Sequence, residues 1–173
     1  ECDGSGNVNV SRFGNRLAGC GGSINLTQRT QNVIFLTTFS SGGLEVSVMD
    51  GALEIVKEGR FGKFTEQVGQ ITFSADVAKA KGQNIMYITE RCVFVLGPRG
   101  LTLTEVAPGV DIDRDILSRL PFAPVVETPR VMDRSLFMRK RMGLRRLMQE
   151  LNIHDRLTYD HARNTVFMDY SGL

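Results

Sequence analysis

The sequence has no tryptophan, only two histidines and only three cysteines among its 173 residues. The cysteines at positions 2, 20 and 92 are odd in number and far apart, which argues against a disulfide scaffold. Without a Cys-x-x-Cys pair, and with only His154 and His161 as imidazoles, we expect no zinc or other metal site. This cysteine usage favours a reducing compartment, the cytoplasm or, in a eukaryote, the mitochondrial matrix.

Long apolar runs and a strong charge of one sign are also missing. Apolar runs such as residues 33–36 are far too short to cross a bilayer, and no charged-then-apolar leader opens the sequence. Twenty-one basic and 19 acidic residues leave a formal net charge of +2, which does not favour a nucleic-acid or membrane partner. We therefore expect a soluble protein that binds neither.

What is present is ordinary globular composition, with 42% hydrophobic and 23% charged residues, and this excludes wholesale disorder. The length suits one compact domain or one half of a larger one. The first residue is Glu1 and not methionine, so we expect a processed chain or a piece of something longer.

Strands and turns dominate the first two thirds of the sequence. Residues 32–39 form a β-branched and aromatic run that is typical of a buried central strand. Residues 44–56 predict a hairpin, because Asp50-Gly51 between two apolar arms supplies the positive φ angles of a two-residue turn. Apolar residues at helical spacing over residues 111–120 predict a helix. Strands alternating with a few helices indicate an α/β or α+β sheet protein.

The last third of the sequence has a different character. Three prolines between residues 121 and 129 indicate an extended linker, residues 143–151 an amphipathic helix, and residues 157–170 a hairpin. We accordingly expect a core at residues 1–125 and a C-terminal extension at residues 126–173.

The most informative stretch is Gly19-Cys20-Gly21-Gly22-Ser23. Three glycines in four positions allow the backbone to approach a ligand and to aim amide N–H groups at a developing negative charge. A tight turn between strands needs the same glycines, and the pattern alone favours that simpler interpretation. Both interpretations stay open here.

Other polar clusters have plain structural interpretations. The basic residues of the segment 139–146 suit phosphate contacts, but a solvated helix face is the favoured interpretation. Asp111, Asp113 and Asp115 suggest a metal, yet acids at a helix start are expected in any case. Glu90-Arg91 inside an apolar segment predicts a buried or structural ion pair.

A family resemblance carries the interpretation further. The motifs GNVNVS at residues 6–11 and LAGCGGSIN at residues 17–25 resemble the C-terminal half of a family I coenzyme A transferase, closest to the single-chain propionate or acetate/acetoacetate type. Further similar segments follow in the family's order, at residues 32–39, 42–44, 70–74, 87–94, 107–111, 157–160 and 164–167. The resemblance implies an α/β fold with an open, mostly parallel sheet, flanking helices and hairpins, the coenzyme A transferase (NagB/RpiA-like) architecture.

The resemblance also implies an activity, the transfer of coenzyme A between carboxylic acids through a glutamyl-CoA thioester. It places the loop Gly19, Cys20, Gly21, Gly22 and Ser23 beside the acyl group, as oxyanion donors and pocket lining. Asn9 and Asn25 are implied as neighbours of the active site. Ser23 replaces the larger apolar residue usual in the family. Cys20 lines the pocket or packs inside, and packing is favoured.

The nucleophilic glutamate of the family lies in a Glu-x-Gly motif upstream of the Asn-Val-Asn stretch. Here Glu1-Cys2-Asp3-Gly4 has the wrong spacing, so we expect the catalytic residue to lie upstream of Glu1 and the chain alone to be inactive. The implied partners are acyl-CoA, a short-chain carboxylate, and the missing N-terminal half or a companion subunit, within a homo-oligomer. Coenzyme A is a co-substrate, and no permanently bound cofactor is expected.

Two other functions remain open at this point. A sister enzyme on the same scaffold would hydrolyse acyl-CoA, with water in place of the acceptor carboxylate. A non-catalytic interaction domain derived from the family would expose the face on which the missing half once packed.

Overall fold

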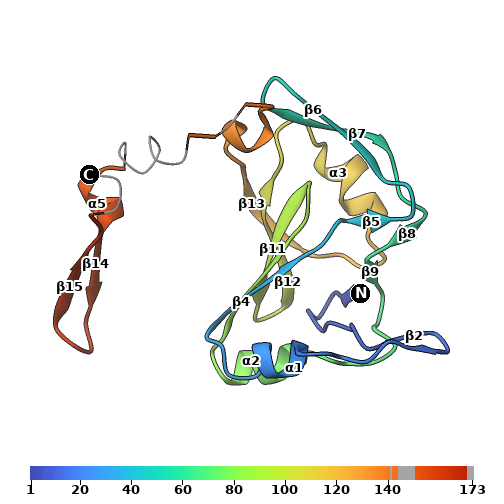
Figure 1. Ribbon diagram of the computed structural model, residues 1–173, viewed down its shortest axis with the longest axis horizontal. Coiled ribbons are helices and arrows are strands. Elements are labelled where there is room, and N and C mark those ends of the chain that lie inside the picture. Colours follow the sequence, from blue (N-terminus) through green and yellow to red (C-terminus); the bar gives the residue numbers. More distant parts are fainter. Residues whose placement is uncertain (141, 144–150, 171–173) are drawn as a thin grey trace. The chain divides into compact units, whose positions relative to one another are not determined.

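The computed structural model describes the chain except for residue 141, residues 144–150 and residues 171–173. The chain divides into two compact units, residues 1–138 and residues 139–173, which are drawn together in Figure 1. The helix predicted at residues 143–151 lies mostly outside the described residues. The predicted boundary between a core at residues 1–125 and a C-terminal extension at residues 126–173 stays a prediction.

The first unit is built on a five-stranded sheet with the order β13-β12-β11-β10-β4 (Figure 1). Its strands are β4 (Asn32–Leu36), β10 (Asn84–Ile88), β11 (Cys92–Gly97), β12 (Gly100–Val106) and β13 (Val125–Val131). The predicted open α/β sheet is confirmed, but the sheet is mixed and not mostly parallel. The pairs β4–β10 and β12–β13 are parallel, whereas short turns join β10, β11 and β12 and make their pairings antiparallel.

Both outer strands differ from what the sequence predicted. The apolar run at residues 32–39 supplies β4, which ends at Leu36 and lies at the edge of the sheet and not at its centre. At the opposite edge, residues 125–131 form β13 although a linker was predicted there. Pro129 fits because it falls where the β12–β13 register shifts, so its missing N–H costs no ladder bond.

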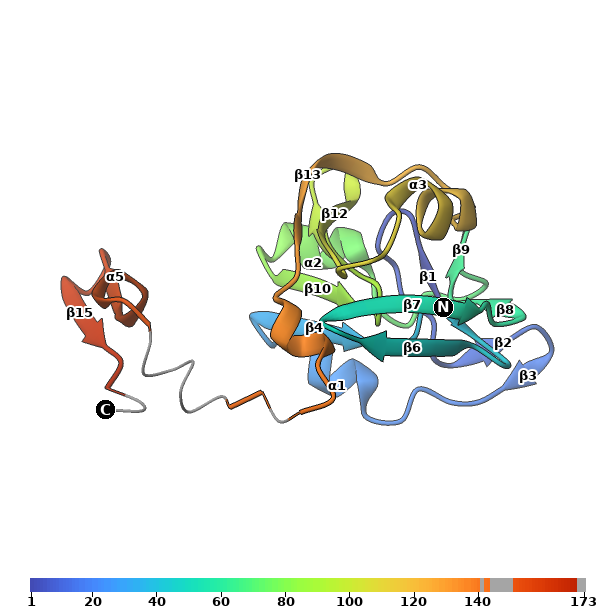
Figure 2. The same ribbon diagram turned by 90° about the horizontal axis from the view of Figure 1, so that it is seen from above.

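Two apolar layers cover the two faces of the sheet. On one face, the N-terminal segment and α2 (Ala75–Ala80) pack against the alternate residues Ile85, Tyr87 and Phe94. On the other face, a hairpin of β6 (Glu45–Met49) and β7 (Ala52–Lys57), together with the short 3-10 helix η2 (Arg134–Phe137), packs against β11. Figure 2 shows β6 and β7 side by side. The buried residues of this second layer are Leu53, Val93, Ala107, Met132 and Phe137.

The predicted turn of the β6–β7 hairpin is confirmed. Asp50 has a φ of 53° and Gly51 a φ of 78°, the left-handed pair that a tight two-residue turn requires. The helix predicted at residues 111–120 forms in two pieces, α3 (Ile112–Asp115) and η1 (Leu117–Arg119), because Ile116 between them leaves helical geometry and is fully buried.

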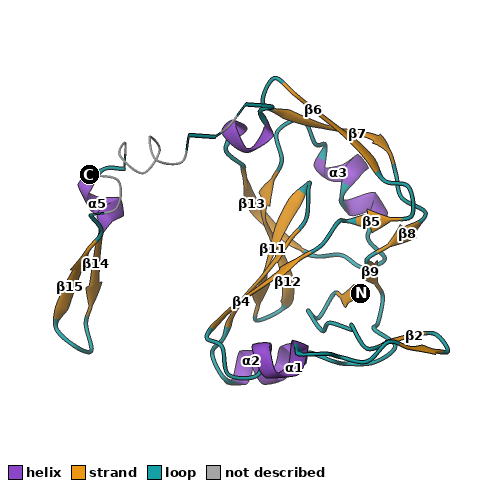
Figure 3. Cartoon of the chain, in the orientation of Figure 1, coloured by secondary structure: helices purple, strands orange, loops and turns teal. Residues whose placement is uncertain are grey.

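Short elements complete the described chain (Figure 3). In the first unit they are β1 (Cys2–Asp3), β2 (Arg12–Phe13), β3 (Arg16–Leu17), α1 (Ser23–Thr27), β5 (Ser40–Ser41), β8 (Phe61–Gly62) and β9 (Phe64–Thr65). The second unit holds α5 (Ile153–Arg156) and the predicted hairpin, formed by β14 (Leu157–Asp160) and β15 (Thr165–Met168). No helix among the described residues is long and apolar enough to span a bilayer.

A fully buried guanidinium links several of these elements. Arg91 forms ion pairs with Glu58 and with Glu90, where Nε lies 2.7 Å from Oε1, and it stacks 4.5 Å over the ring of Phe39. Its Nη1 also donates to the carbonyl of Asp115 at 3.0 Å. Burial alone would lower the pKa of Arg91, but its hydrogen bonds to the two glutamates raise that pKa above the ordinary value. The predicted Glu90-Arg91 ion pair is therefore confirmed, and Arg91 also contacts Glu58, Phe39 and Asp115.

Candidate functional site

The glycine loop, residues 19–22, connects β3 to α1. Gly19 has a φ of 77° and Gly21 a φ of 52°, values that L-residues with a side chain rarely adopt. The amide of Ser23 donates to the carbonyl of Cys20 at 3.1 Å and closes the turn. A Cβ added at Gly19 or Gly21 would meet no atom within 4 Å, so the glycines serve the backbone conformation and not close packing within the chain.

The loop is held at its start by Ser11. The Ser11 carbonyl accepts from the amides of Ala18 at 2.8 Å and Gly19 at 3.0 Å. The Ser11 hydroxyl lies 2.8 Å from that of Thr72, and the Thr72 hydroxyl also accepts from the amide of Val10 at 3.2 Å. Through Ser11, these bonds tie the loop to Thr72, which is 61 residues from Ser11 in the sequence, and so fix the start of the loop.

Asn9 has its side chain fully buried and saturated with internal hydrogen bonds. Its Nδ2 donates to the Glu1 carboxylate at 3.0 Å and to the Arg12 carbonyl at 2.5 Å, while its Oδ1 accepts from the amides of Ser11 and Arg12, both at 3.1 Å. Asn9 therefore fixes the bend that leads to Ser11 and the glycine loop. Its contact with a substrate stays a prediction.

The remaining loop amides are available as donors. The amide of Gly19 donates to the carbonyl of Ser11. Among the described residues, the amides of Cys20, Gly21 and Gly22 donate no hydrogen bond. Gly21 and Gly22 are exposed, and Ser23 is half-buried. Asn25 is exposed, and its amide oxygen accepts a long bond of 3.5 Å from Gln28. Three adjacent unpaired amides can stabilise an oxyanion.

The surface around the loop is apolar and uncovered. Leu17 has 76% and Leu26 has 72% of its surface exposed, and Ile24 has 44%. Helix α1 buries none of its residues. A patch of this kind beside unpaired amides is typical of a surface that another chain segment or a ligand covers.

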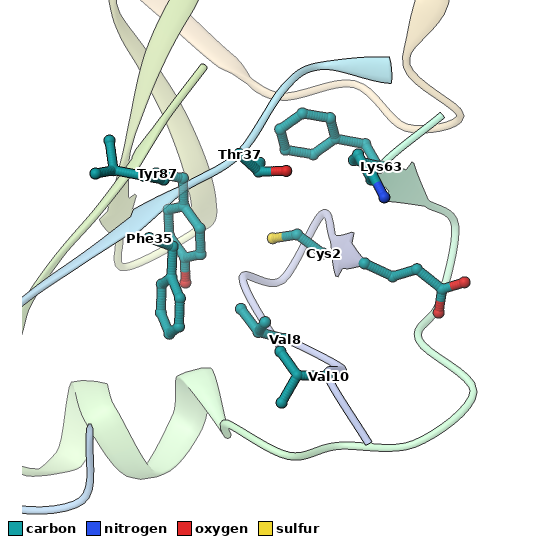
Figure 4. A pocket seen from close by; sticks show the side chains of 10 residues that line it. Cys2, Val8, Val10, Phe35, Thr37, Lys63 and Tyr87 are labelled. Carbon is teal, nitrogen blue, oxygen red and sulfur yellow. The ribbon is translucent and has the colours of Figure 1, made fainter. Parts of the chain in front are cut away.

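A separate cavity of about 180 Å³ lies between the N-terminal segment and the sheet (Figure 4). Cys2, Val8, Phe35 and Tyr87 give it apolar walls, and Lys63 places an ammonium group at its lining. The Tyr87 hydroxyl donates to the carbonyl of Gly6 at 2.5 Å, so it is already paired. No residue of the glycine loop lines this cavity, and the two features are distinct in the described chain.

Comparison with known proteins tests the family resemblance, whereas the role of the glycine loop stays a prediction. No family model matches the chain. It is 45% identical over 154 residues to a caffeate CoA-transferase of Acetobacterium woodii, covering 86% of this chain and 29% of that protein. It is 42% identical over 144 residues to the acetate CoA-transferase YdiF of Escherichia coli K12, covering 83% of this chain and 27% of that protein.

A solved structure supports the same assignment. The acyl-CoA transferase YdiF of E. coli O157:H7, in a thioester complex with CoA, matches with a TM-score of 0.80 and 42% identity, over 83% of this chain and 28% of that one. Over more than four fifths of its length, the chain is homologous to a part of these coenzyme A transferases. The predicted family and fold class are confirmed. The chain spans less than a third of the length of these relatives.

The acidic cluster Asp111, Asp113 and Asp115 lies at the start of α3. The Asp111 carboxylate accepts from the amide of Arg114 at 2.8 Å and caps α3, so the predicted helix start at these acidic residues is confirmed. A bidentate pair with Arg114 at 2.8 Å lowers the pKa of Asp115. Within the described part of the chain, no three His, Cys, Asp or Glu side chains gather as metal ligands.

The three thiols of the chain should differ sharply in reactivity. Burial raises the pKa of Cys2 and of Cys92 to about 12, whereas Cys20 is half-buried. Because the thiolate is the nucleophile, we expect iodoacetamide at pH 8 to modify Cys20 first and the other two only after unfolding in urea. Peptide mass spectrometry over time measures this. Equal rates at Cys92 and Cys20 in the folded chain would contradict the expectation.

Proposed function

We propose that the chain supplies part of the active site of an acyl-CoA:carboxylate CoA-transferase. The observation that carries this proposal is the 42–45% identity to two CoA-transferases over more than four fifths of the chain. The substrates we propose are an acyl-CoA and a short-chain carboxylate. The polypeptide that carries the nucleophilic glutamate, as an N-terminal half or a companion subunit, is the proposed partner.

The proposed chemistry exchanges one activated acyl group for another of similar energy. A glutamate carboxylate attacks the thioester carbonyl, the C–S bond breaks, and a mixed anhydride and the CoA thiolate form. The thiolate attacks the glutamyl carbonyl of the anhydride, which releases the first carboxylate and leaves a glutamyl-CoA thioester. A second carboxylate then takes over the CoA by the reverse steps. Each addition passes through a tetrahedral oxyanion.

The chain's own contribution to these steps is the glycine loop. We infer that the unpaired amides of Cys20, Gly21 and Gly22 donate to the oxyanion, at about 3 to 4 kcal/mol of transition-state stabilisation for a well-placed donor. Ser11 and Thr72 act as positioning residues because their bonds fix the loop without exposing a reactive group. Asn25, exposed two residues after Ser23, is the proposed polar neighbour of the acyl group.

The experiment that tests the function uses the complete transferase polypeptide. It is incubated with a short-chain acyl-CoA and its intact mass is measured before and after borohydride. The expected result is a covalent CoA adduct that borohydride removes, at a glutamate outside this chain, and CoA transfer that requires an acceptor carboxylate. Absence of any adduct, or release of free CoA without an acceptor, would contradict the transferase proposal.

A glycine substitution tests the loop itself. Gly21 and Gly14 have similar φ values, 52° and 58°, and a Cβ at either would meet no atom within 4 Å. Gly21→Ala and Gly14→Ala should therefore cost similar stability, about 1–2 kcal/mol each. In the complete transferase we expect Gly21→Ala to lower kcat/KM by about 10-fold or more beyond Gly14→Ala. Equal losses of activity would remove the loop from the site.

A further inference from the structure

Strand β4 has one backbone edge that nothing pairs in the described chain. The carbonyl of Gln31 accepts from the amide of Asn84 at 2.8 Å, and the amide of Thr37 donates to Ile88 at 3.1 Å. In a parallel pair alternate residues point their N–H and C=O groups at the neighbour. Odd-numbered residues of β4 therefore face β10. The even-numbered ones, Asn32, Ile34 and Leu36, direct their backbone groups away from the sheet.

The side chains of β4 divide in the same way. Val33 is buried, and Phe35 packs against the rings of Phe73 at 5.1 Å and Tyr87 at 5.4 Å, on the face that the N-terminal segment covers. Ile34 and Leu36 point to the opposite face and are 58% and 76% exposed. The layer formed by the β6–β7 hairpin and η2 buries residues of β11 on that face but leaves these two open.

An edge with free N–H and C=O groups and exposed apolar side chains is a template for strand addition. We propose that the free edge of β4 pairs with a strand of the remaining transferase polypeptide, whose apolar residues cover Ile34 and Leu36. The inference rests on the proposed function, since that function requires a remaining polypeptide.

The length of the relatives favours the remaining polypeptide as the source of the strand that pairs with β4. The chain accounts for 27–29% of the relatives' length, so more than two thirds of such a protein lies outside the matched region and is available to supply the strand. The position also suits catalysis. Helix α1 ends at Thr27 and β4 begins at Asn32, and both lie at the same end of the sheet in Figure 1. A strand on β4 would therefore bring the remaining polypeptide close to the glycine loop.

Amide hydrogen exchange in the complete transferase tests the pairing directly. The amide of Phe35 faces β10 and is the internal reference for a bonded strand. We expect the amides of Ile34 and Leu36 to exchange as slowly as that of Phe35, because an added strand bonds them. Exchange about 100-fold faster than at Phe35, the behaviour of a free edge, would overturn the proposal.

A charge substitution supplies the second test, with a matched control. Ile34 on β4 and Val56 on β7 are both 58% exposed, so a lysine at either position leaves the first unit itself intact. The complete transferase is cleaved between this chain and the remaining polypeptide, and sedimentation measures how tightly the two parts associate. Ile34→Lys should weaken this association about 10-fold or more. Val56→Lys should change it less than about 2-fold. Equal effects would overturn the proposal.

The outcomes separate this inference from the proposed function. Protected Ile34 and Leu36 amides without CoA transfer would support the pairing and reject the transferase. CoA transfer with fast exchange at both amides would reject the pairing and keep the transferase. Protection that appears in this chain alone, and rises with its concentration, would replace the proposed occupant by a second copy of the chain and so overturn the proposal.

Discussion

Replacing Arg91 with methionine is expected to lower the free energy of unfolding by about 3–5 kcal/mol. Methionine has a similar volume and packs in the same space, but it leaves the carboxylates of Glu58 and Glu90 without their cation. Their side chains are only 22% and 16% exposed, so water screens their repulsion poorly. The Asp115 carbonyl and the ring of Phe39 lose a partner at the same time.

Urea unfolding followed by circular dichroism measures the Arg91 effect. The matched control is Arg99→Met, because Arg99 pairs with Glu127 at 3.6 Å while both side chains are more than 70% exposed. Exposed pairs contribute little, so the control should change the free energy of unfolding by less than about 1 kcal/mol. Similar losses of unfolding free energy in the two variants would show that the buried Arg91 network stabilises the protein no more than the exposed Arg99 pair does.

Gly100→Ala is expected to destabilise the first unit by about 3–5 kcal/mol, through backbone strain together with a clash. Gly100 has a φ of 110°, a conformation that alanine adopts only with strain. A Cβ at this position would lie 2.5 Å from the carbonyl oxygen of Gly4, a backbone atom that cannot rotate away. That same carbonyl accepts from the amide of Leu101 at 3.1 Å, so relief of the clash would break a hydrogen bond.

Gly43 offers a control in which the strain is present and the clash is absent. Its φ is 104°, and a Cβ there would meet no atom within 4 Å. Gly43→Ala should therefore cost about 1–2 kcal/mol. The difference between the two variants in thermal or urea unfolding isolates the contact between the N-terminal segment and the β11–β12 hairpin. A difference near zero would show that the N-terminal segment moves away from the added Cβ without lowering the free energy of unfolding.

Local chemistry explains which parts of the fold were predictable from sequence. The Asp50-Gly51 turn depends on the φ preferences of two adjacent residues, and the structure has it as predicted. The cap of α3 by Asp111 is equally local. The place of β4 in the sheet is not local, because the same apolar run suits a central strand or an edge that another polypeptide covers. Pro129 likewise signalled a linker, and only the register of β13 on β12 shows why a strand accommodates it.

The candidate site divides in the same way. The positive φ angles at Gly19 and Gly21 follow from glycine itself, and the sequence pointed to this loop before any comparison. The burial of Asn9 and the tie between Ser11 and Thr72 depend on contacts across the fold. No pattern within a short window reports such contacts. The sequence signal that preceded them was the family resemblance, which covers both segments together.

The parallel pairing of β4 with β10 has a consequence for the order of synthesis. Asn32 and Asn84, whose side chains bond at 2.8 Å, are 52 residues apart in the chain. At about 5–20 residues per second, a ribosome needs roughly 3 to 10 s to make β10 after β4 has been made. During that interval the run Asn32–Leu36, which is apolar and rich in β-formers, lacks its partner β10. On crowded polysomes this segment of a nascent chain is therefore exposed to aggregation until β10 is made.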